Sequence, residues 1–219
     1  IDSVVVSAAL ARLDAVKCPV LHLYREKELG FVMRHTGAEF VIVPGTWKGF
    51  DYAEMATGLA AQMDPSPTVL SVSELVEADP STLPTAPAHA DGEEPVRWIY
   101  STSGTTSDPK GVQHTDATLI AVGRGLADAL QMTPEDVGSI AFPYAHIAGP
   151  DYLVMMLLTG MSAAIVEAFM PADAIAFYRR NGVTMAGGAT AFYQMFLAAQ
   201  REQPGEPIIP TLRALSGGG

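Results

Sequence analysis

The second half of this 219-residue chain alternates short apolar runs with amphipathic stretches, and this alternation constrains the fold more than any other feature. The runs that we expect to be strands are residues 138–142, 162–166, 183–186 and 211–216. The stretches that we expect to be helices are residues 151–158, 171–180 and 189–200. Strands that alternate with helices form a mainly parallel sheet whose two faces are covered by helices. We therefore predict an α/β fold of mainly parallel sheets flanked by helices.

The first part of the chain predicts a smaller unit of the same class. Here we expect helices at residues 1–13, 25–35 and 50–63 and strands at residues 16–21, 40–43 and 68–72. An acidic, proline-rich connection follows, and then a strand at residues 96–102 and a helix at residues 114–130. The expected organisation is an α/β unit over residues 1–76, a connection over residues 77–95 and a second α/β unit over residues 96–219.

Composition excludes several classes of function. The chain has 13 Lys and Arg residues and 24 Asp and Glu residues, which gives a formal net charge of −11. This negative charge argues against a nucleic-acid partner. The longest apolar segment, residues 152–166, is short of the roughly 20 residues that cross a bilayer and contains Gly160, so we expect no membrane span. The sequence carries no signal for an oligomeric state.

The single cysteine, Cys18, rules out a disulfide within the chain and favours a reducing cytoplasmic location. A catalytic thiol is one interpretation of this residue. Its position between Val16 and Val20 instead favours a small buried side chain.

One segment has the composition of a phosphate-binding loop. Residues 100–111 read Tyr-Ser-Thr-Ser-Gly-Thr-Thr-Ser-Asp-Pro-Lys-Gly. Hydroxyl side chains and glycines bring backbone donors close to an anion, and Lys110 adds a positive charge. The common nucleotide P-loop needs Gly before the lysine and Ser or Thr after it, whereas Pro109 and Gly111 flank Lys110 here. A serine- and threonine-rich surface turn is the alternative interpretation.

This segment resembles the phosphate loop of the adenylate-forming superfamily, whose form is Tyr-Thr-Ser-Gly-Thr-Thr-Gly-x-Pro-Lys-Gly. Ser101 stands in place of the family's Tyr, and Ser107 in place of a Gly. The resemblance implies a catalytic role for Lys110 and a contact between Thr102 and Mg²⁺. It also implies that the phosphates of ATP bind to Thr102, Ser103, Gly104, Thr105, Thr106 and Lys110.

Three further segments extend the resemblance. Residues 143–149, Pro-Tyr-Ala-His-Ile-Ala-Gly, are similar to the superfamily's aromatic-His-x-x-Gly segment, with Ala145 in place of the aromatic residue. This implies that His146 borders the pocket for the carboxylate substrate. A second segment is similar to the family's acyl-pocket wall, which implies substrate contacts for Gly187, Gly188, Ala189 and Thr190. A third is similar to the loop that lies along the adenine, which implies cofactor contacts for Gly217 and Gly218. Glycines that shape a tight turn remain an alternative for the second segment, and a fraying loop for the third.

The substrate is expected to be a plain carboxylic acid. Peptide-synthetase relatives place an Asp near the histidine to hold an amino group, and no Asp occurs at residues 144–146. A buried amine without a counterion would be costly.

The resemblance as a whole implies an acyl-CoA synthetase. Such an enzyme uses ATP, Mg²⁺ and coenzyme A to convert a fatty or related acid into an acyl-adenylate and then a thioester. We expect the sequence to be a piece of the large N-terminal domain and to be inactive alone, because the family's Tyr-Gly-x-Thr-Glu segment, ribose-binding Asp and late catalytic Lys do not occur in it. A non-catalytic nucleotide-binding or scaffold module of the same fold is the alternative; a kinase-type phosphotransferase fits the lysine context less well.

Overall fold

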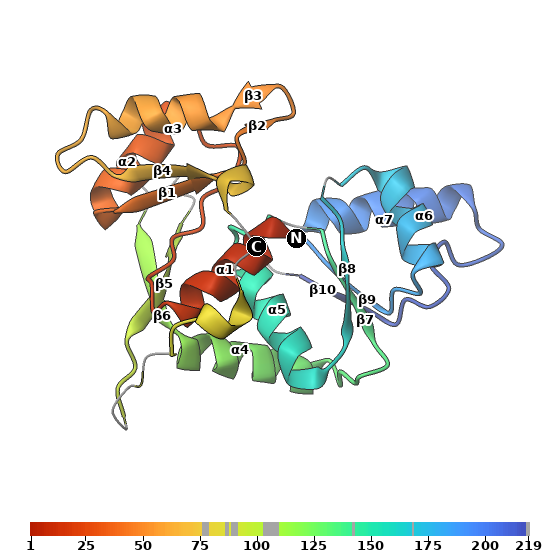
Figure 1. Cartoon of the computed structure of the whole chain (residues 1–219). Coiled ribbons are helices and arrows are strands. Elements are labelled where there is room, and N and C mark those ends of the chain that lie inside the picture. The colour runs from red at the N-terminus through yellow and green to blue at the C-terminus, as the bar shows by residue number, and fades with distance from the viewer. Residues whose placement is uncertain are drawn as a thin grey trace.

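The computed structural model describes residues 1–75, 79–85, 88, 92–102, 110–141, 143–167 and 169–217 (Figure 1). Its largest sheet has four parallel strands in the order β10-β9-β7-β8. These strands are β7 (Val137–Ile140), β8 (Ser162–Ile165), β9 (Met185–Gly187) and β10 (Ala214–Ser216). The parallel sheet that the sequence alternation predicts is confirmed.

Helices cover both faces of this sheet (Figure 1). One face carries α4 (Asp116–Ala129) and α5 (Ala148–Thr159), and the other carries α6 (Pro171–Arg180) and α7 (Thr190–Glu202). Ile140 packs with Met155 and Tyr152 on the first face, whereas Ala186 packs with Tyr178 and Phe196 on the second. Each face therefore has its own apolar core.

The N-terminal part contains a smaller parallel pair, in which β1 (Phe40–Val43) lies beside β4 (Thr68–Ser71). The other elements of this part are α1 (Asp2–Arg12), α2 (Glu26–Thr36), β2 (Thr46–Trp47), β3 (Phe50–Asp51), α3 (Tyr52–Ala60) and two 3-10 turns, Val72–Glu74 and Pro80–Thr82. Its core brings Met33 of α2 and Ala56 of α3 against Val43 of β1.

Two expectations for this part are corrected. The strand predicted at residues 16–21 is reduced to one bridge between Lys17 and Trp98, because Pro19 has no backbone N–H with which to continue a ladder. The helix predicted from residue 50 begins at Tyr52 instead. Asp51 caps it by accepting a hydrogen bond from the Glu54 backbone N–H at 2.9 Å, and Phe50 pairs with Trp47 in the β2–β3 hairpin.

This hairpin also contacts the larger sheet. The Trp47 indole Nε1–H donates to the Glu167 carboxylate at 2.9 Å, just beyond the end of β8. A surface cavity beside this contact is lined by Lys48 of the hairpin, by Val166, and by Phe177 and Arg180 of α6.

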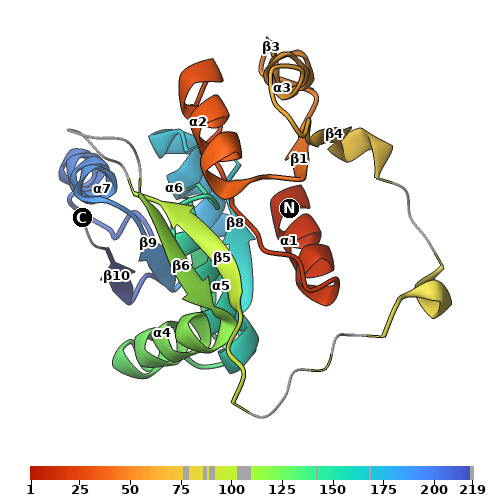
Figure 2. The same cartoon turned by 90° about the vertical axis from the view of Figure 1, so that its left-hand side faces the viewer.

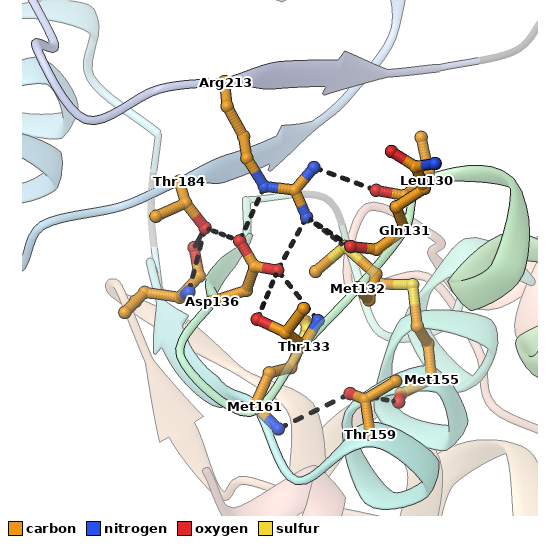
Figure 3. Close-up of polar contacts among 11 residues, drawn as sticks. Leu130, Gln131, Met132, Thr133, Asp136, Met155, Thr159, Met161, Thr184 and Arg213 are labelled. Atoms are coloured by element: carbon orange, nitrogen blue, oxygen red, sulfur yellow. Dashed lines mark hydrogen bonds and ion pairs between the residues drawn. The ribbon is translucent and has the colours of Figure 1, made fainter.

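A buried carboxylate holds the amino-terminal edge of the parallel sheet (Figure 3). Asp136, Thr184 and Arg213 each lie one residue before a strand, namely β7, β9 and β10. Asp136 accepts hydrogen bonds from the Thr184 hydroxyl at 2.6 Å and from the Arg213 guanidinium at 2.6 and 2.8 Å. The hydrogen bonds from Arg213 hold the pKa of Asp136 well below its usual range, against the opposing effect of burial.

No helix in the described part of the chain combines the length and apolar character needed to cross a membrane.

Candidate functional site

The phosphate-loop segment is carried by a β-hairpin (Figure 2). Strand β5 (Val96–Ser101) pairs antiparallel with β6 (Gly111–Thr115), and Ser101 lies opposite Gly111. The sequence predicts no strand at β6, because Gly-Val-Gln-His-Thr has no strand-like alternation; pairing with β5 supplies its backbone partners. The expected helix begins only after β6, at Asp116, where Thr115 caps α4.

Two predicted phosphate-binding residues close the base of this loop. The Thr102 backbone N–H donates to the Lys110 carbonyl oxygen at 2.9 Å, and the Lys110 N–H donates to the Thr102 hydroxyl at 3.2 Å. The two ends of the loop are therefore adjacent, and Lys110 is exposed at the base of the loop. Ser103, Gly104, Thr105 and Thr106 lie outside the described residues.

His146 lies in a tight turn between β7 and α5. Its backbone N–H donates to the Pro143 carbonyl at 2.9 Å, and its carbonyl accepts from Gly149 at 2.8 Å. The imidazole Nδ1 accepts a hydrogen bond from the Ala148 N–H at 3.2 Å. In the neutral ring this assigns the proton to Nε2, so the exposed side chain offers one N–H donor.

The glycines after β9 and β10 meet at the carboxyl edge of the sheet. The Gly188 N–H donates to the Ser216 carbonyl at 3.1 Å. A Cβ on Gly217 would lie 2.2 Å from the Gly188 carbonyl oxygen and 2.1 Å from the Tyr193 hydroxyl. Packing alone therefore explains why residue 217 is a glycine. Gly218 lies outside the described residues.

Ala189 and Thr190 begin helix α7 directly after these glycines. Ala189 is the N-cap residue and makes no side-chain capping bond, and both residues are exposed. The first turn of a helix has backbone N–H groups without intrahelical partners, so this edge can donate to an anionic group.

The described parts of the phosphate-loop hairpin and of the His146 turn pack against each other. Tyr100 of β5 belongs to an apolar cluster with Trp98 and Leu119, and Tyr144 and Ile147 of the turn pack on it. Thr102 follows Tyr100 by two residues, and His146 follows Tyr144 by two. Gly187 is the last residue of β9, and the turn, residues 188–190 and residue 217 follow strands of the same parallel sheet. These segments therefore lie at its carboxyl edge, where ligands of such sheets bind.

A buried carboxylate that the sequence motifs do not predict lies behind this edge. Asp151 in the first turn of α5 is 8% exposed, and burial raises its pKa to about 6. Burial, with smaller contributions from nearby Tyr144 and Asp151, also raises the pKa of Tyr100. The available signal was the presence of one charged residue in an otherwise uncharged helix, residues 148–159.

Cys18 is not activated as a nucleophile. Burial raises the pKa of its thiol to about 11, so the thiol stays protonated at neutral pH. This agrees with the interpretation of Cys18 as a small, mostly buried side chain.

Comparison with known proteins identifies relatives along the whole chain. A family model described as AMP-binding enzyme matches residues 1–219. The medium-chain fatty-acid–CoA ligase of Escherichia coli is 28% identical over 92% of this chain and 38% of its own length. The 2-hydroxy-7-methoxy-5-methyl-1-naphthoate–CoA ligase of Streptomyces carzinostaticus is 28% identical over 94% of this chain and 40% of its own. The chain thus spans about two fifths of each ligase.

Solved structures share the fold. The o-succinylbenzoate CoA synthetase of Bacillus subtilis, in complex with an acyl-adenylate intermediate, superposes with a TM-score of 0.80 at 24% identity, over 100% of this chain and 53% of that chain. The same synthetase in complex with ATP and a magnesium ion gives a TM-score of 0.77 at 22% identity, over 100% of this chain and 42% of that one. In both comparisons, this chain matches only part of the longer synthetase chain.

Proposed function

This chain belongs to the AMP-binding enzyme family, and from that membership we propose that the whole protein is an AMP-forming acid–CoA ligase. The relatives named above from Escherichia coli and Streptomyces carzinostaticus are both acid–CoA ligases, and the Bacillus subtilis synthetase has been solved in complex with an acyl-adenylate and with ATP and magnesium. The observation that carries the proposal is the hairpin base at Thr102 and Lys110, in a chain that matches the family over its whole length.

Lys110 and Thr102 have separate roles in the proposed reaction. The ammonium group of Lys110 neutralises phosphate charge as the leaving group departs. The Thr102 hydroxyl oxygen accepts one hydrogen bond from Lys110 and keeps a second lone pair, so it fits the oxygen ligands that Mg²⁺ prefers. A bound Mg²⁺ would supply further positive charge to the phosphates.

The proposed chemistry takes place in two displacements. A carboxylate oxygen of the substrate forms a bond to the α-phosphorus of ATP, and the bond from that phosphorus to the bridging oxygen breaks, releasing pyrophosphate. The thiolate of coenzyme A then attacks the acyl carbon and AMP leaves. His146 can donate from Nε2 to the substrate carboxylate, and the residues at 187–190 and 217 form the edge along which acid and adenine lie.

We propose a fatty or related carboxylic acid as the substrate. No carboxylate occurs at residues 144–146 to pair with a substrate amine, and the two ligases named above act on acids whose names carry no amino group. The units at residues 1–76 and 96–219, the connection between them and a cytoplasmic location stay predictions.

A non-catalytic nucleotide-binding or scaffold module is the second candidate. The observation that favours it is the departure of Ser101, Ser107 and Ala145 from the family pattern. Ser107 is the most costly of these if the family's Gly adopts a positive φ there.

Pyrophosphate release separates the two candidates. The complete gene product is incubated with ATP, Mg²⁺ and a panel of short, medium, long and cyclic acids, each with and without coenzyme A. We expect acid-dependent pyrophosphate release and, with coenzyme A present, a thioester detected by mass spectrometry. Folded protein that binds ATP but releases no pyrophosphate above the no-acid control would favour the scaffold module.

A further inference from the structure

Two buried oxygen atoms behind the candidate site have no hydrogen-bond partner among the described residues. They are Oδ1 of Asp151 and the hydroxyl of Tyr100, whose residues are 8% and 4% exposed. The hydroxyl of Tyr144 is also buried and lacks a well-formed hydrogen bond within the described part, although the Ser7 side chain of α1 lies beside it. The three groups come from different elements: α5, β5 and the turn that carries His146.

Tyr144 and Asp151 each lie close enough to Tyr100 to influence its ionisation, and Tyr144 packs on the apolar cluster that contains Tyr100. Tyr144 and Asp151 both disfavour ionisation of Tyr100, and Cys18, in the segment after α1, adds a smaller effect. Along α5, Tyr152 and Met155 pack into the sheet core, and Val154 lies beside Gly123 of α4. Among the three buried groups, Asp151 supplies the only carboxylate.

A buried polar atom without a hydrogen-bond partner destabilises the fold. Buried waters remove such losses by making about three hydrogen bonds to otherwise unpaired groups. Two phenol hydroxyls can donate or accept, and a carboxylate accepts, so the three groups together can satisfy a bridging water. A structural role of this kind would affect stability alone.

The positions of these groups in the chain give them a more specific consequence. Tyr100 precedes Thr102 by two residues, and Tyr144 precedes His146 by two. Tyr100 is thus part of the phosphate-loop hairpin, and Tyr144 is part of the turn beside the proposed carboxylate pocket. These two segments, the hairpin and the turn, are the two arms of the site. Adenylation needs the α-phosphorus and the substrate carboxylate in line, so the separation of these two arms controls the reaction.

We propose that Asp151 is a positioning residue that acts through the hydroxyls of Tyr100 and Tyr144 to hold the phosphate-loop hairpin and the His146 turn at a fixed separation. The role in catalysis rests on the proposed function, whereas the mechanical link between the two arms does not. Asp151 touches neither substrate in this account. Its effect is therefore expected on turnover at saturation rather than on the affinity for ATP.

The test compares four variants of the complete protein with the wild type. Asp151→Leu removes the polar group at similar volume, Tyr100→Phe and Tyr144→Phe each remove one hydroxyl, and Asp128→Leu on the exposed side of α4 is the matched control. We expect Asp151→Leu to lower kcat for acid-dependent pyrophosphate release roughly 10- to 100-fold. The dissociation constant for ATP should change less than about threefold, and Asp128→Leu should match the wild type.

Hydrogen exchange tests the mechanical link independently of activity. In Asp151→Leu, amide exchange should accelerate at both residues 98–102 and residues 143–149, and combining Tyr100→Phe with Asp151→Leu should add little to either effect. If Asp151→Leu does not fold, Tyr144→Phe replaces it in both measurements. Acceleration confined to one arm, or unchanged kcat in a folded, active protein, would overturn the proposal. A wild type without acid-dependent turnover would contradict the proposed function instead, and hydrogen exchange would still decide the link.

Discussion

Arg213 and Asp136 form a two-point ion pair, in which the guanidinium Nε donates to Oδ1 at 2.8 Å and Nη2 donates to Oδ2 at 2.6 Å (Figure 3). The Asp136 side chain is 6% exposed and the Arg213 side chain 39% exposed. Arg213 also donates to the carbonyls of Leu130, the C-cap residue of α4, and of Gln131, the next residue in the loop to β7. The pair therefore ties β10 to β7 at the edge opposite the candidate site, so its energetics can be tested without changing that site.

Removing the Asp136 carboxylate should strongly destabilise the fold. Asp136→Ala leaves the Thr184 hydroxyl and the Thr133 N–H without their acceptor and Arg213 without its counterion. Breaking a buried pair from one side lowers the free energy of unfolding by about 3–5 kcal/mol, and the partial exposure of Arg213 puts the expected loss near the lower limit. Urea unfolding measures it, with exposed Asp128→Ala as control, expected within about 0.5 kcal/mol of the wild type. Equal losses in the two variants would show that the pair contributes nothing.

The same pair should make stability sensitive to acid. The folded-state pKa of Asp136 lies well below the unfolded value of about 3.9, chiefly because of the hydrogen bonds from Arg213. Its stabilisation is fully present above the unfolded pKa and is lost as pH falls toward the folded pKa. Unfolding free energies measured from pH 5 to pH 2.5 should fall more steeply for the wild type than for Asp136→Asn. Parallel curves would contradict this assignment.

Asp151 should have the opposite pH dependence. Burial raises its folded-state pKa to about 6, above the unfolded value, so stability is greatest at low pH and is lost as pH rises from about 4 to about 6. Each unit of difference corresponds to about 1.4 kcal/mol. The other titratable groups around Tyr100, namely Tyr144 and Cys18, and Tyr100 itself do not titrate in this window because the pKa of each is raised above its ordinary value. Asp151→Asn should remove this slope in urea unfolding, and a slope that persists in the variant would assign it to another group.

The sequence predicts elements well where local pattern and tertiary pairing agree. The helix expected at residues 171–180 has those bounds in the structure, because Pro171 begins it and Arg179 and Arg180 favour its last turn. Strand β6 has no local pattern, so only its pairing with β5 reveals it. In the same way the ends of the predicted strands indicate where the site lies. Asp151 has no spacing signal; it is marked in the sequence only as the one charged residue of an apolar helix, and the structure shows that it is buried.

Gly217 should not tolerate a side chain. A Cβ there would lie 2.2 Å from the Gly188 carbonyl oxygen, which is backbone and cannot move without separating β10 from β9. We expect Gly217→Ala to lower the free energy of unfolding by about 1–3 kcal/mol. Gly205→Ala is the control, since no atom lies within 4 Å of its added Cβ. A loss in Gly217→Ala no greater than in the control would show that the chain turns differently at this point.

Lys110→Ala should impair adenylation without affecting the hairpin. The described bonds of Lys110 to Thr102 use backbone N–H and C=O groups, so truncating the side chain leaves both of them intact. A charge-assisted contact to a phosphate contributes about 1.5–3 kcal/mol, which corresponds to a roughly 10- to 150-fold lower rate of acid-dependent pyrophosphate release.

Two further variants serve as controls for Lys110→Ala: one removes a different lysine, and the other changes Lys110 conservatively. Lys27→Ala, at an exposed position of α2, removes the same charge from the protein and should retain the wild-type rate. Lys110→Arg keeps a cation and should recover part of the rate, although its planar fork differs in geometry from an ammonium group. Equal rates for Lys110→Ala and Lys27→Ala would exclude Lys110 from the reaction. A loss in Lys110→Ala together with a lower melting temperature would point instead to a structural role for the side chain.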